Sequence, residues 1–265
     1  MYSDLKNKVI IVTGGAGAIG GATVKTFLET GAKVAVVDKD TQKGEEFIKG
    51  LGAGEVIFIP VDVSDEAQTK QMVERVIERF GQIDVLVNVA GGAIGGDITE
   101  IDLPTFYKNI DMNLTPAWLC IQGVIPHMKK RGGGVIINIS SVNGLTGIGE
   151  AAYSAAKAGV DSLARTTGVR YGKYGIRCNS LALGTIATYT RNWAERLKKD
   201  PKVLDKIASK IPRKRVGTPE EAASVILFLA SEESRLINGA TIVADGGWTL
   251  SCGTVKEKEG PWWED

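Results

Sequence analysis

Side chains capable of proton-transfer chemistry lie close together in residues 141–157. Tyr153 and Lys157 are four residues apart, so on a helix they share one face. A free tyrosine, with a pKa of about 10, is a poor base at neutral pH, and a nearby ammonium group lowers that pKa by favouring the phenolate. Ser141 adds a hydroxyl group to the same span. The spacing indicates a general acid and base, although the surrounding alanines are also compatible with simple helix packing.

The composition disfavours several classes of function. The 265 residues carry a formal net charge of +1, which gives no electrostatic reason to bind nucleic acid or an anionic membrane. The three cysteines form no Cys-x-x-Cys motif and cannot all pair, so we expect a reducing, cytoplasmic setting. The single histidine, His127, sits among basic residues near the end of an expected helix, and we expect no metal site. The short apolar run at 9–12 predicts neither a membrane span nor a signal peptide.

Short apolar runs alternate with longer amphipathic stretches along the chain. Continuous β-branched runs predict parallel strands that are buried on both faces. We expect strands at 8–13, 33–38, 55–62, 83–91, 134–140, 175–183 and 239–246. Helices are expected at 67–80, with Ser64 or Asp65 as its cap, and at 103–130, 153–171 and 219–230. The pattern predicts an α/β protein: a doubly wound Rossmann fold with a seven-stranded, mostly parallel sheet and helices on both faces.

No long polar linker or internal repeat divides residues 1–265, so we predict one domain. The amphipathic stretch 185–215 interrupts the alternation and is predicted to be a substrate lid. Its apolar residues Ile186, Tyr189, Trp193 and Leu197 recur at helical spacing, which is also compatible with packing against the body or a neighbouring subunit. Residues 253–265 form a C-terminal tail whose Trp262 and Trp263 are expected to dock on this subunit or another.

A glycine-rich turn, Thr13 to Gly21, follows the first expected strand and runs into helical sequence. Glycines at such a turn let the backbone approach a pyrophosphate group, whose charge the helix N-terminus stabilises. Turns need glycine in any case, so the run alone is weak evidence. Its position between a strand and a helix is the context that a dinucleotide motif requires.

Two acidic residues follow the next strands. Asp38 ends the second strand, where an acid accepts hydrogen bonds from the ribose hydroxyls and repels a 2′-phosphate, so it favours NAD over NADP. Lys39 follows directly and softens that preference, and a solvated turn is the alternative for Asp38. Asp62 ends the third strand, where the adenine would lie; capping the next helix is the alternative.

With these elements in place, the chain resembles the short-chain dehydrogenase/reductase family over nearly its whole length. The family's glycine motif TGxxxGxG appears at 13–20, with Ala18 replacing the middle glycine. The family's NNAG motif appears at 88–91, with Val89 in place of the second asparagine. The serine motif SxxG fits Ser141 better than the adjacent Ser140, and the YxxxK pair follows.

The resemblance implies two sets of site residues. The catalytic residues are Asn113, Ser141, Tyr153 and Lys157. Tyr153 would be the general acid/base, Lys157 its tuner and ribose anchor, and Ser141 the group that orients the substrate oxygen. Asn113 would hold a water that links Lys157 to solvent. The cofactor-binding residues are Gly14, Gly17, Ala18, Ile19, Gly20, Asp38, Asp62, Val63, Asn88, Ala90, Gly91, Tyr153, Lys157, Gly184, Thr185, Ile186 and Thr188.

The expected function is hydride transfer between NAD(H) and a secondary alcohol or ketone, and NADP(H) is the less expected cofactor. The substrate would be a simple alcohol, a sugar or a polyol. One alternative is reduction of a 3-oxoacyl thioester on an acyl carrier protein, which Asp38 disfavours because such relatives mostly use NADP. The other alternative is a non-catalytic dinucleotide-binding regulator, although such proteins usually lose the tyrosine or lysine. Relatives are commonly tetramers, so the resemblance implies a homotetramer built through residues 103–130 and 153–172.

Overall fold

The computed structural model describes residues 2–52, 54–188 and 191–251. Within these ranges the backbone forms a seven-stranded sheet whose spatial order is β3-β2-β1-β4-β5-β6-β7, and every neighbouring pair is parallel. The strands are β1 (Val9–Thr13), β2 (Lys33–Asp38), β3 (Val56–Pro60), β4 (Val85–Asn88), β5 (Gly134–Ser141), β6 (Ile176–Leu183) and β7 (Thr241–Ala244). The predicted doubly wound α/β fold is therefore confirmed.

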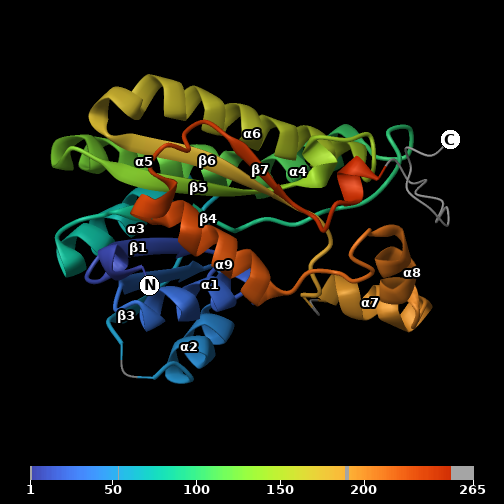
Figure 1. The fold of residues 1–265 in the computed structure, drawn as a ribbon, viewed down its shortest axis with the longest axis horizontal. Helices are drawn as coiled ribbons and strands as arrows, with labels where there is room; N and C mark the ends of the chain where they lie inside the picture. The colour runs from blue at the N-terminus through green and yellow to red at the C-terminus, as the bar shows by residue number, and fades with distance from the viewer. Residues whose placement is uncertain (1, 53, 189–190, 252–265) are drawn as a thin grey trace, which may run out of the picture.

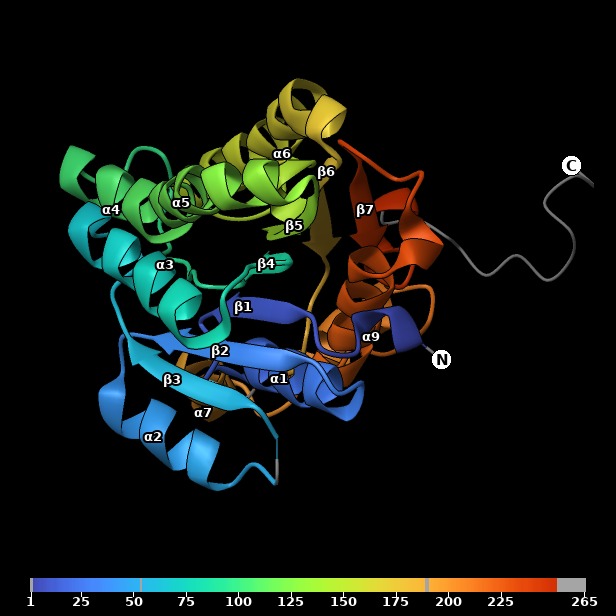
Figure 2. The ribbon, with the colours of Figure 1, turned by 90° about the vertical axis from the view of Figure 1, so that its left-hand side faces the viewer.

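Helices cover both faces of the sheet (Figures 1 and 2). One layer holds α3 (Glu66–Phe80), α4 (Leu103–Asn113), α5 (Thr115–Arg131) and α6 (Ala151–Tyr171). The other holds α1 (Ala18–Glu29), α2 (Thr41–Lys49) and α9 (Pro219–Ala230). The two helices α7 (Arg191–Lys199) and α8 (Val203–Lys210) lie at one end of the sheet (Figure 1). Because both faces are covered, all residues of β1 and β4 are buried, which explains their continuous apolar sequences.

The strand order reverses between β1 and β4, which are neighbours although two strands separate them in sequence. In open parallel sheets, ligands bind beyond the carboxyl ends of the strands at such a switch point. Thr13, the last residue of β1, accepts hydrogen bonds at Oγ1 from the backbone N–H groups of Val89 and Ala90 at 3.1 and 3.2 Å. The loop that follows β4 is thereby tied to the glycine turn that follows β1.

The structure corrects one prediction about helices and decides between the alternatives of another. The single helix expected at 103–130 is two helices, because Pro116 has no N–H to donate to the carbonyl one turn before it and its ring clashes with that carbonyl. The cap of α3 is Asp65, whose carboxylate accepts from Gln68 N at 2.9 Å, so neither Ser64 nor Asp62 caps this helix.

The stretch predicted as a lid leaves the sheet after β6 and returns to the same place. Ala187 N donates to Gly217 O, and Gly217 N donates to Thr185 O, both at 2.9 Å. These bonds close the base of the segment that contains α7 and α8. Tyr189 and the tail 253–265 lie outside the described residues.

We expect Gly20→Ala to destabilise the fold, because a Cβ atom on Gly20 would lie 2.1 Å from the Gly14 carbonyl oxygen, which is backbone and cannot rotate away. Overpacking of this kind lowers the free energy of unfolding by about 1–3 kcal/mol, measurable by urea denaturation. Gly52→Ala is the control, because a Cβ there meets no atom within 4 Å. Equal stability of the Gly20→Ala variant and the wild type would contradict this packing.

Candidate active site

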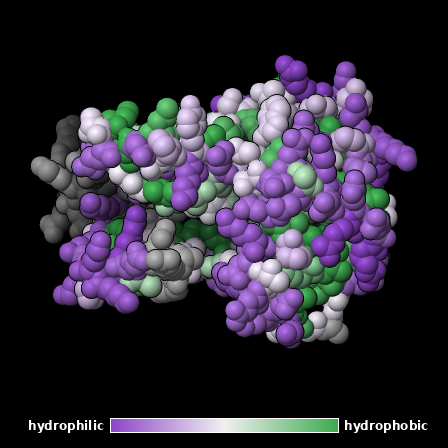
Figure 3. Space-filling view, turned by 180° about the vertical axis from the view of Figure 1, so that it is seen from behind, coloured by the Kyte–Doolittle hydropathy of each residue, from purple (hydrophilic) through white to green (hydrophobic). Residues whose placement is uncertain are grey.

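A cavity of about 930 Å³ opens at the carboxyl edge of the sheet. Figure 3 shows the molecule hollowed between the α7–α8 region, whose surface is largely hydrophilic, and the body. Segments distant in sequence line this cavity, from the β1–α1 turn to α6 and the residues after β6. Every predicted site residue lines it except Asn88 and Asn113.

The glycine turn supplies one end of the cavity. Gly14 has a φ of +62°, in the region that favours glycine, and a Cβ there would lie 3.0 Å from Ala90 N. Helix α1 then begins at Ala18, and its N-cap residue Gly17 offers no side-chain cap. A close-approaching backbone and an uncapped helix N-terminus beside a cavity are the features that a pyrophosphate group requires. Ala18, where the family pattern has glycine, lines the same cavity.

The acidic residues Asp38 and Asp62 lie at this same end. The Asp38 carboxylate accepts from Ala16 N and from Asp40 N, each at 3.2 Å, and is held beside the glycine turn. The Asp62 carboxylate accepts from the Ser64 hydroxyl, the main cause of its lowered pKa. The Lys39 ammonium lies 3.4 Å from Asp62, so its charge is partly offset by that carboxylate.

Asn88 and Asn113 lie beneath the cavity and support its loops. Asn88 Nδ2 donates to Asn138 Oδ1 at 2.9 Å across the β4–β5 pair. Asn113 donates to the carbonyl groups of Gly92 and Asn109 at 2.8 and 2.9 Å, and it accepts from Gly92 N. Their predicted contacts with cofactor and water stay predictions; the geometry shows that Asn88 joins β4 to the Asn138 side chain of β5 and that Asn113 holds the backbone of Gly92 and Asn109.

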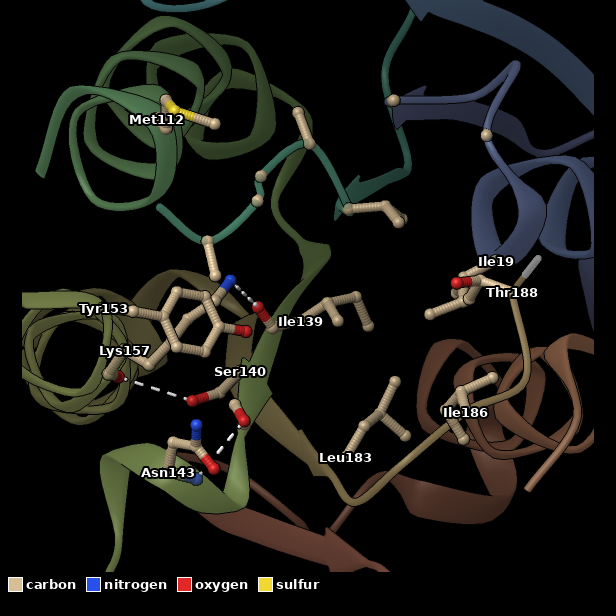
Figure 4. A pocket seen from close by; sticks show the side chains of 18 of the residues that line it. Ile19, Met112, Ile139, Ser140, Asn143, Tyr153, Lys157, Leu183, Ile186 and Thr188 are labelled. Atoms are coloured by element: carbon tan, nitrogen blue, oxygen red, sulfur yellow. Dashed lines mark hydrogen bonds between the residues drawn. The ribbon is translucent and has the colours of Figure 1, made fainter. Parts of the chain in front are cut away.

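Ser141, Tyr153 and Lys157 all line the cavity, and Figure 4 shows Tyr153 beside Lys157. The Lys157 Nζ lies 5.7 Å from the centroid of the Tyr153 ring and donates to the Ile139 carbonyl at 2.8 Å. The Ser141 hydroxyl lies near enough to the Tyr153 phenol to lower its pKa. Ser140, by contrast, donates its hydroxyl to the Lys157 carbonyl at 3.3 Å. The three predicted catalytic side chains are therefore brought together, with Ser141 and not Ser140 facing the phenol.

Burial dominates the electrostatics of this group. It raises the pKa of Tyr153, with the Glu150 charge adding to the rise and the Ser141 hydrogen bond opposing it. Burial also lowers the pKa of Lys157 to about 8, against the opposing charge of Asp161. The expectation that Lys157 lowers the pKa of Tyr153 is wrong for the protein alone: a buried phenolate loses more hydration than its neighbours replace.

The opposite wall comes from the segment after β6 and from the predicted lid. Gly184, Thr185, Ile186 and Thr188 line the cavity, as predicted for the cofactor site. Trp193 lines it as well, whereas Leu197 does not, and the Arg191 side chain lies outside the described residues.

An ion pair joins the two walls near the opening. Arg196 of α7 lies 3.5 Å from the Glu150 carboxylate, and its guanidinium lies 5.4 Å from the Trp193 ring centroid. Glu150 precedes α6, which carries Tyr153. The predicted lid therefore touches the segment that bears the catalytic candidates.

Several residues that line the cavity were not predicted from the sequence: Met112, Ile148, Arg196, Lys210 and Trp248. Trp248 follows β7 at the carboxyl edge, so the rule for parallel sheets could have found it. Arg196 and Lys210 carry no such signal, because their places depend on how α7 and α8 pack.

Among the described residues, no His, Cys, Asp and Glu side chains form a group of three or more that could hold a metal ion. None of the helices in this part of the chain combines the length and apolarity needed to cross a membrane.

Comparisons with known proteins show which family the chain belongs to. Residues 14–249 match the family model described as "Enoyl-(Acyl carrier protein) reductase". The chain is 37% identical to L-rhamnose-1-dehydrogenase of Scheffersomyces stipitis over 255 residues, which are 93% of this chain and 98% of that protein. It is 34% identical to meso-2,3-butanediol dehydrogenase of Serratia marcescens over 252 residues, 94% and 98% of the two chains.

A solved structure of a family member is also similar to this chain. An oxidoreductase of the short-chain dehydrogenase/reductase family from Burkholderia thailandensis superposes with a TM-score of 0.86 and is 32% identical, with 92% of this chain and 94% of that chain covered. Matches of this extent, together with the cavity and its Tyr153–Lys157 wall, show that the chain is an oxidoreductase belonging to the short-chain dehydrogenase/reductase family.

Proposed function

We propose that the protein transfers hydride between NAD(H) and a secondary alcohol or ketone in this cavity. The observation that carries the proposal is that the two ends of the cavity hold different kinds of residue. One end holds the glycine turn and the Asp38 carboxylate, and the other holds Tyr153, Ser141 and Lys157. A dinucleotide that lies along the cavity from the first end would bring its reactive ring near the second.

The residues present fit NAD(H). The glycine turn and the uncapped start of α1 suit the pyrophosphate, and Asp38 suits the ribose hydroxyls. Lys39 is the cation that would bind a 2′-phosphate, and its ammonium group is paired with the Asp62 carboxylate. When bound, the nicotinamide supplies the group that accepts or donates the hydride.

Tyr153 is proposed to exchange the proton with the substrate oxygen, and Ser141 to orient that oxygen. Because the pKa of Tyr153 is raised, the phenol is protonated at neutral pH and suited to donating its proton to a ketone. Oxidation of an alcohol needs the phenolate, so in the forward direction we expect the rate to rise with pH. Lys157 donates beneath the phenol and is proposed to anchor the ribose as well.

The substrate class follows from the relatives' names and from the cavity wall. L-rhamnose and 2,3-butanediol, named in two relatives, both carry secondary hydroxyl groups, and here the wall combines Glu150 with the apolar Trp193 and Ile148. The 3-oxoacyl thioester alternative gains support from the acyl carrier protein in the family model's description, while Asp38 opposes its usual NADP. A non-catalytic role is disfavoured because the Tyr153–Ser141 contact is intact.

We also propose a homotetramer and a cytoplasmic setting. Leu103 and Tyr107 of α4 and Trp118 of α5 are exposed, and these large apolar side chains are suited to a subunit contact. Cys120 and Cys178 are buried free thiols whose pKa is raised to about 12 by burial, which fits a reducing compartment.

We expect Tyr153→Phe to lower turnover by at least about a hundredfold, because phenylalanine has no hydroxyl group to exchange a proton with the substrate oxygen. The measurement is NADH formation with a panel of secondary alcohols, sugars, polyols and 3-hydroxyacyl thioesters, run with NAD and NADP in parallel. Binding of NADH to the variant, followed by fluorescence, is the control for an intact site. A variant that binds NADH and keeps near wild-type turnover would remove Tyr153 from its role.

Asp38→Asn should shift the cofactor preference towards NADPH by about tenfold or more, because it removes a negative charge beside the ribose and keeps an acceptor for Ala16 N. The ratio of the NADH and NADPH dissociation constants measures this. Glu45→Gln, an exposed acid on neighbouring α2, is the matched control and should leave the ratio unchanged. A constant ratio in the Asp38→Asn variant would argue against the ribose contact.

Glu150→Gln should lower the pKa of Tyr153, because the Glu150 charge contributes to raising it. The tyrosinate absorbance of the variant would then appear at lower pH, read as a difference against the same variant carrying Tyr153→Phe. Asp111→Asn removes an acid that lines the same cavity without acting on Tyr153, so it serves as the control. An unchanged or raised Tyr153 pKa would refute the contribution of Glu150.

A further inference from the structure

Asp161 is a buried acid to which no role has yet been given. It lies on α6, one helical turn after Lys157, and is 1% exposed. Within the described part of the chain, neither of its buried carboxyl oxygens has a hydrogen-bond partner of good geometry. Burying a carboxylate without partners is costly, so an acid here requires a compensating charge or a proton.

The groups that face Asp161 come from three elements. Lys157 and Arg165 lie one turn before and after it on α6, and Arg165 is exposed. From the sheet, Ser140 of β5 and Ser180 of β6 are near enough to lower the pKa of Asp161, although Ser140 donates to the Lys157 carbonyl and Ser180 Oγ has no partner among the described residues. These neighbours favour the ionised carboxylate, against burial, which raises its pKa.

Lys157 is a buried cation that requires a compensating negative charge. It is 4% exposed, and its ammonium donates to the Ile139 carbonyl, which is a neutral acceptor. Asp161 is the charged group that raises the pKa of Lys157 against the desolvation that lowers it. Two buried, oppositely charged groups at i and i+4 on one helix can compensate each other.

We propose that Asp161 is a positioning residue whose buried carboxylate is the counter-ion that keeps Lys157 as an ammonium group beneath Tyr153. Among the described residues the Asp161 carboxylate makes no hydrogen bond to Lys157, so its charge would act across the gap between the two groups. The inference rests on the proposed function for its catalytic consequence, but this charge interaction is testable without turnover. Asp161 would act through Lys157 and touches neither substrate nor cofactor. An ammonium group at Lys157 is what both the ribose contact and the phenol require, so Asp161 would extend the working range of the site upwards in pH.

The sign of the effect follows from the burial. With Asp161→Asn, nothing opposes the desolvation of Lys157, so its pKa falls below its present value of about 8. Lysine would then lose its proton at a lower pH. An opposite charge near a buried group shifts the pKa of that group by about one unit or more. Removal of the Asp161 charge should therefore lower the proton affinity of Lys157 by about tenfold.

The test is a pH titration of the lysine side-chain resonances in the full chain, labelled with ¹³C and ¹⁵N, in which Lys157→Arg identifies the Lys157 signals. We expect the Asp161→Asn variant to show the lower Lys157 pKa. Glu150→Gln is the matched control, because Glu150 acts on Tyr153 and does not contribute to the pKa of Lys157. An unchanged Lys157 pKa in Asp161→Asn would overturn the proposal.

A second measurement needs no variant and so does not depend on whether Asp161→Asn folds. The ¹³Cγ chemical shift of Asp161 in the wild-type chain distinguishes a carboxylate from a carboxylic acid. We expect a carboxylate at pH 7, and a protonated Asp161 at that pH would overturn its role as counter-ion. If no alcohol in the panel is turned over, the proposed function fails while both titrations still decide the pair. Where turnover is found, the Lys157 limb of its pH profile should move to lower pH in Asp161→Asn.

Discussion

The parallel register of the sheet is the constraint on which the site depends. Parallel pairing places Thr13 of β1 beside Asn88 of β4, Asn88 beside Asn138 of β5, and Asn138 beside Ser180 of β6. These polar side chains form a row across the sheet at the level where the strands approach their carboxyl ends. Three residues beyond Asn138, β5 ends at Ser141 inside the cavity. A slip of one residue in any of these pairs would move polar side chains to the opposite face.

Helix α6 converts this edge into a chemical surface. Its residues Tyr153, Lys157 and Asp161 follow one another at intervals of four, so they descend along one face from the cavity into the interior. The phenol is the group nearest the cavity, the ammonium lies below it against the Ile139 carbonyl, and the carboxylate is deepest. Desolvation acts on all three, and it raises the pKa of the acids while lowering that of the lysine. The protonation states of Tyr153, Lys157 and Asp161 therefore depend on how these three groups interact with one another.

The α7–α8 region adds what the sheet cannot supply. It brings Trp193 and Arg196 over the cavity from the side opposite α6, and the Glu150–Arg196 pair connects the two. Its base is held by backbone bonds between the residues that flank Ile186 and Gly217. The residues after α8 also hold the region to the fold, because Ile211 is buried and Arg213 N donates to Gly246 O. The shape of the substrate end therefore depends on this segment as well as on the sheet.

Local sequence determined the strands, the glycine turn, the acid that ends β2, and the Tyr153–Lys157 spacing, because each depends on neighbours a few residues apart. The break between α4 and α5 was also encoded locally, in Pro116, but the apolar periodicity on either side concealed it. Tertiary structure alone decided that Asn88 bonds to Asn138, that Asn113 holds backbone, that Arg196 reaches Glu150, and that burial is the main cause of the raised pKa of Tyr153. Burial and charge pairing depend on groups brought together from distant parts of the chain, and no local pattern specifies how deeply a side chain is removed from water.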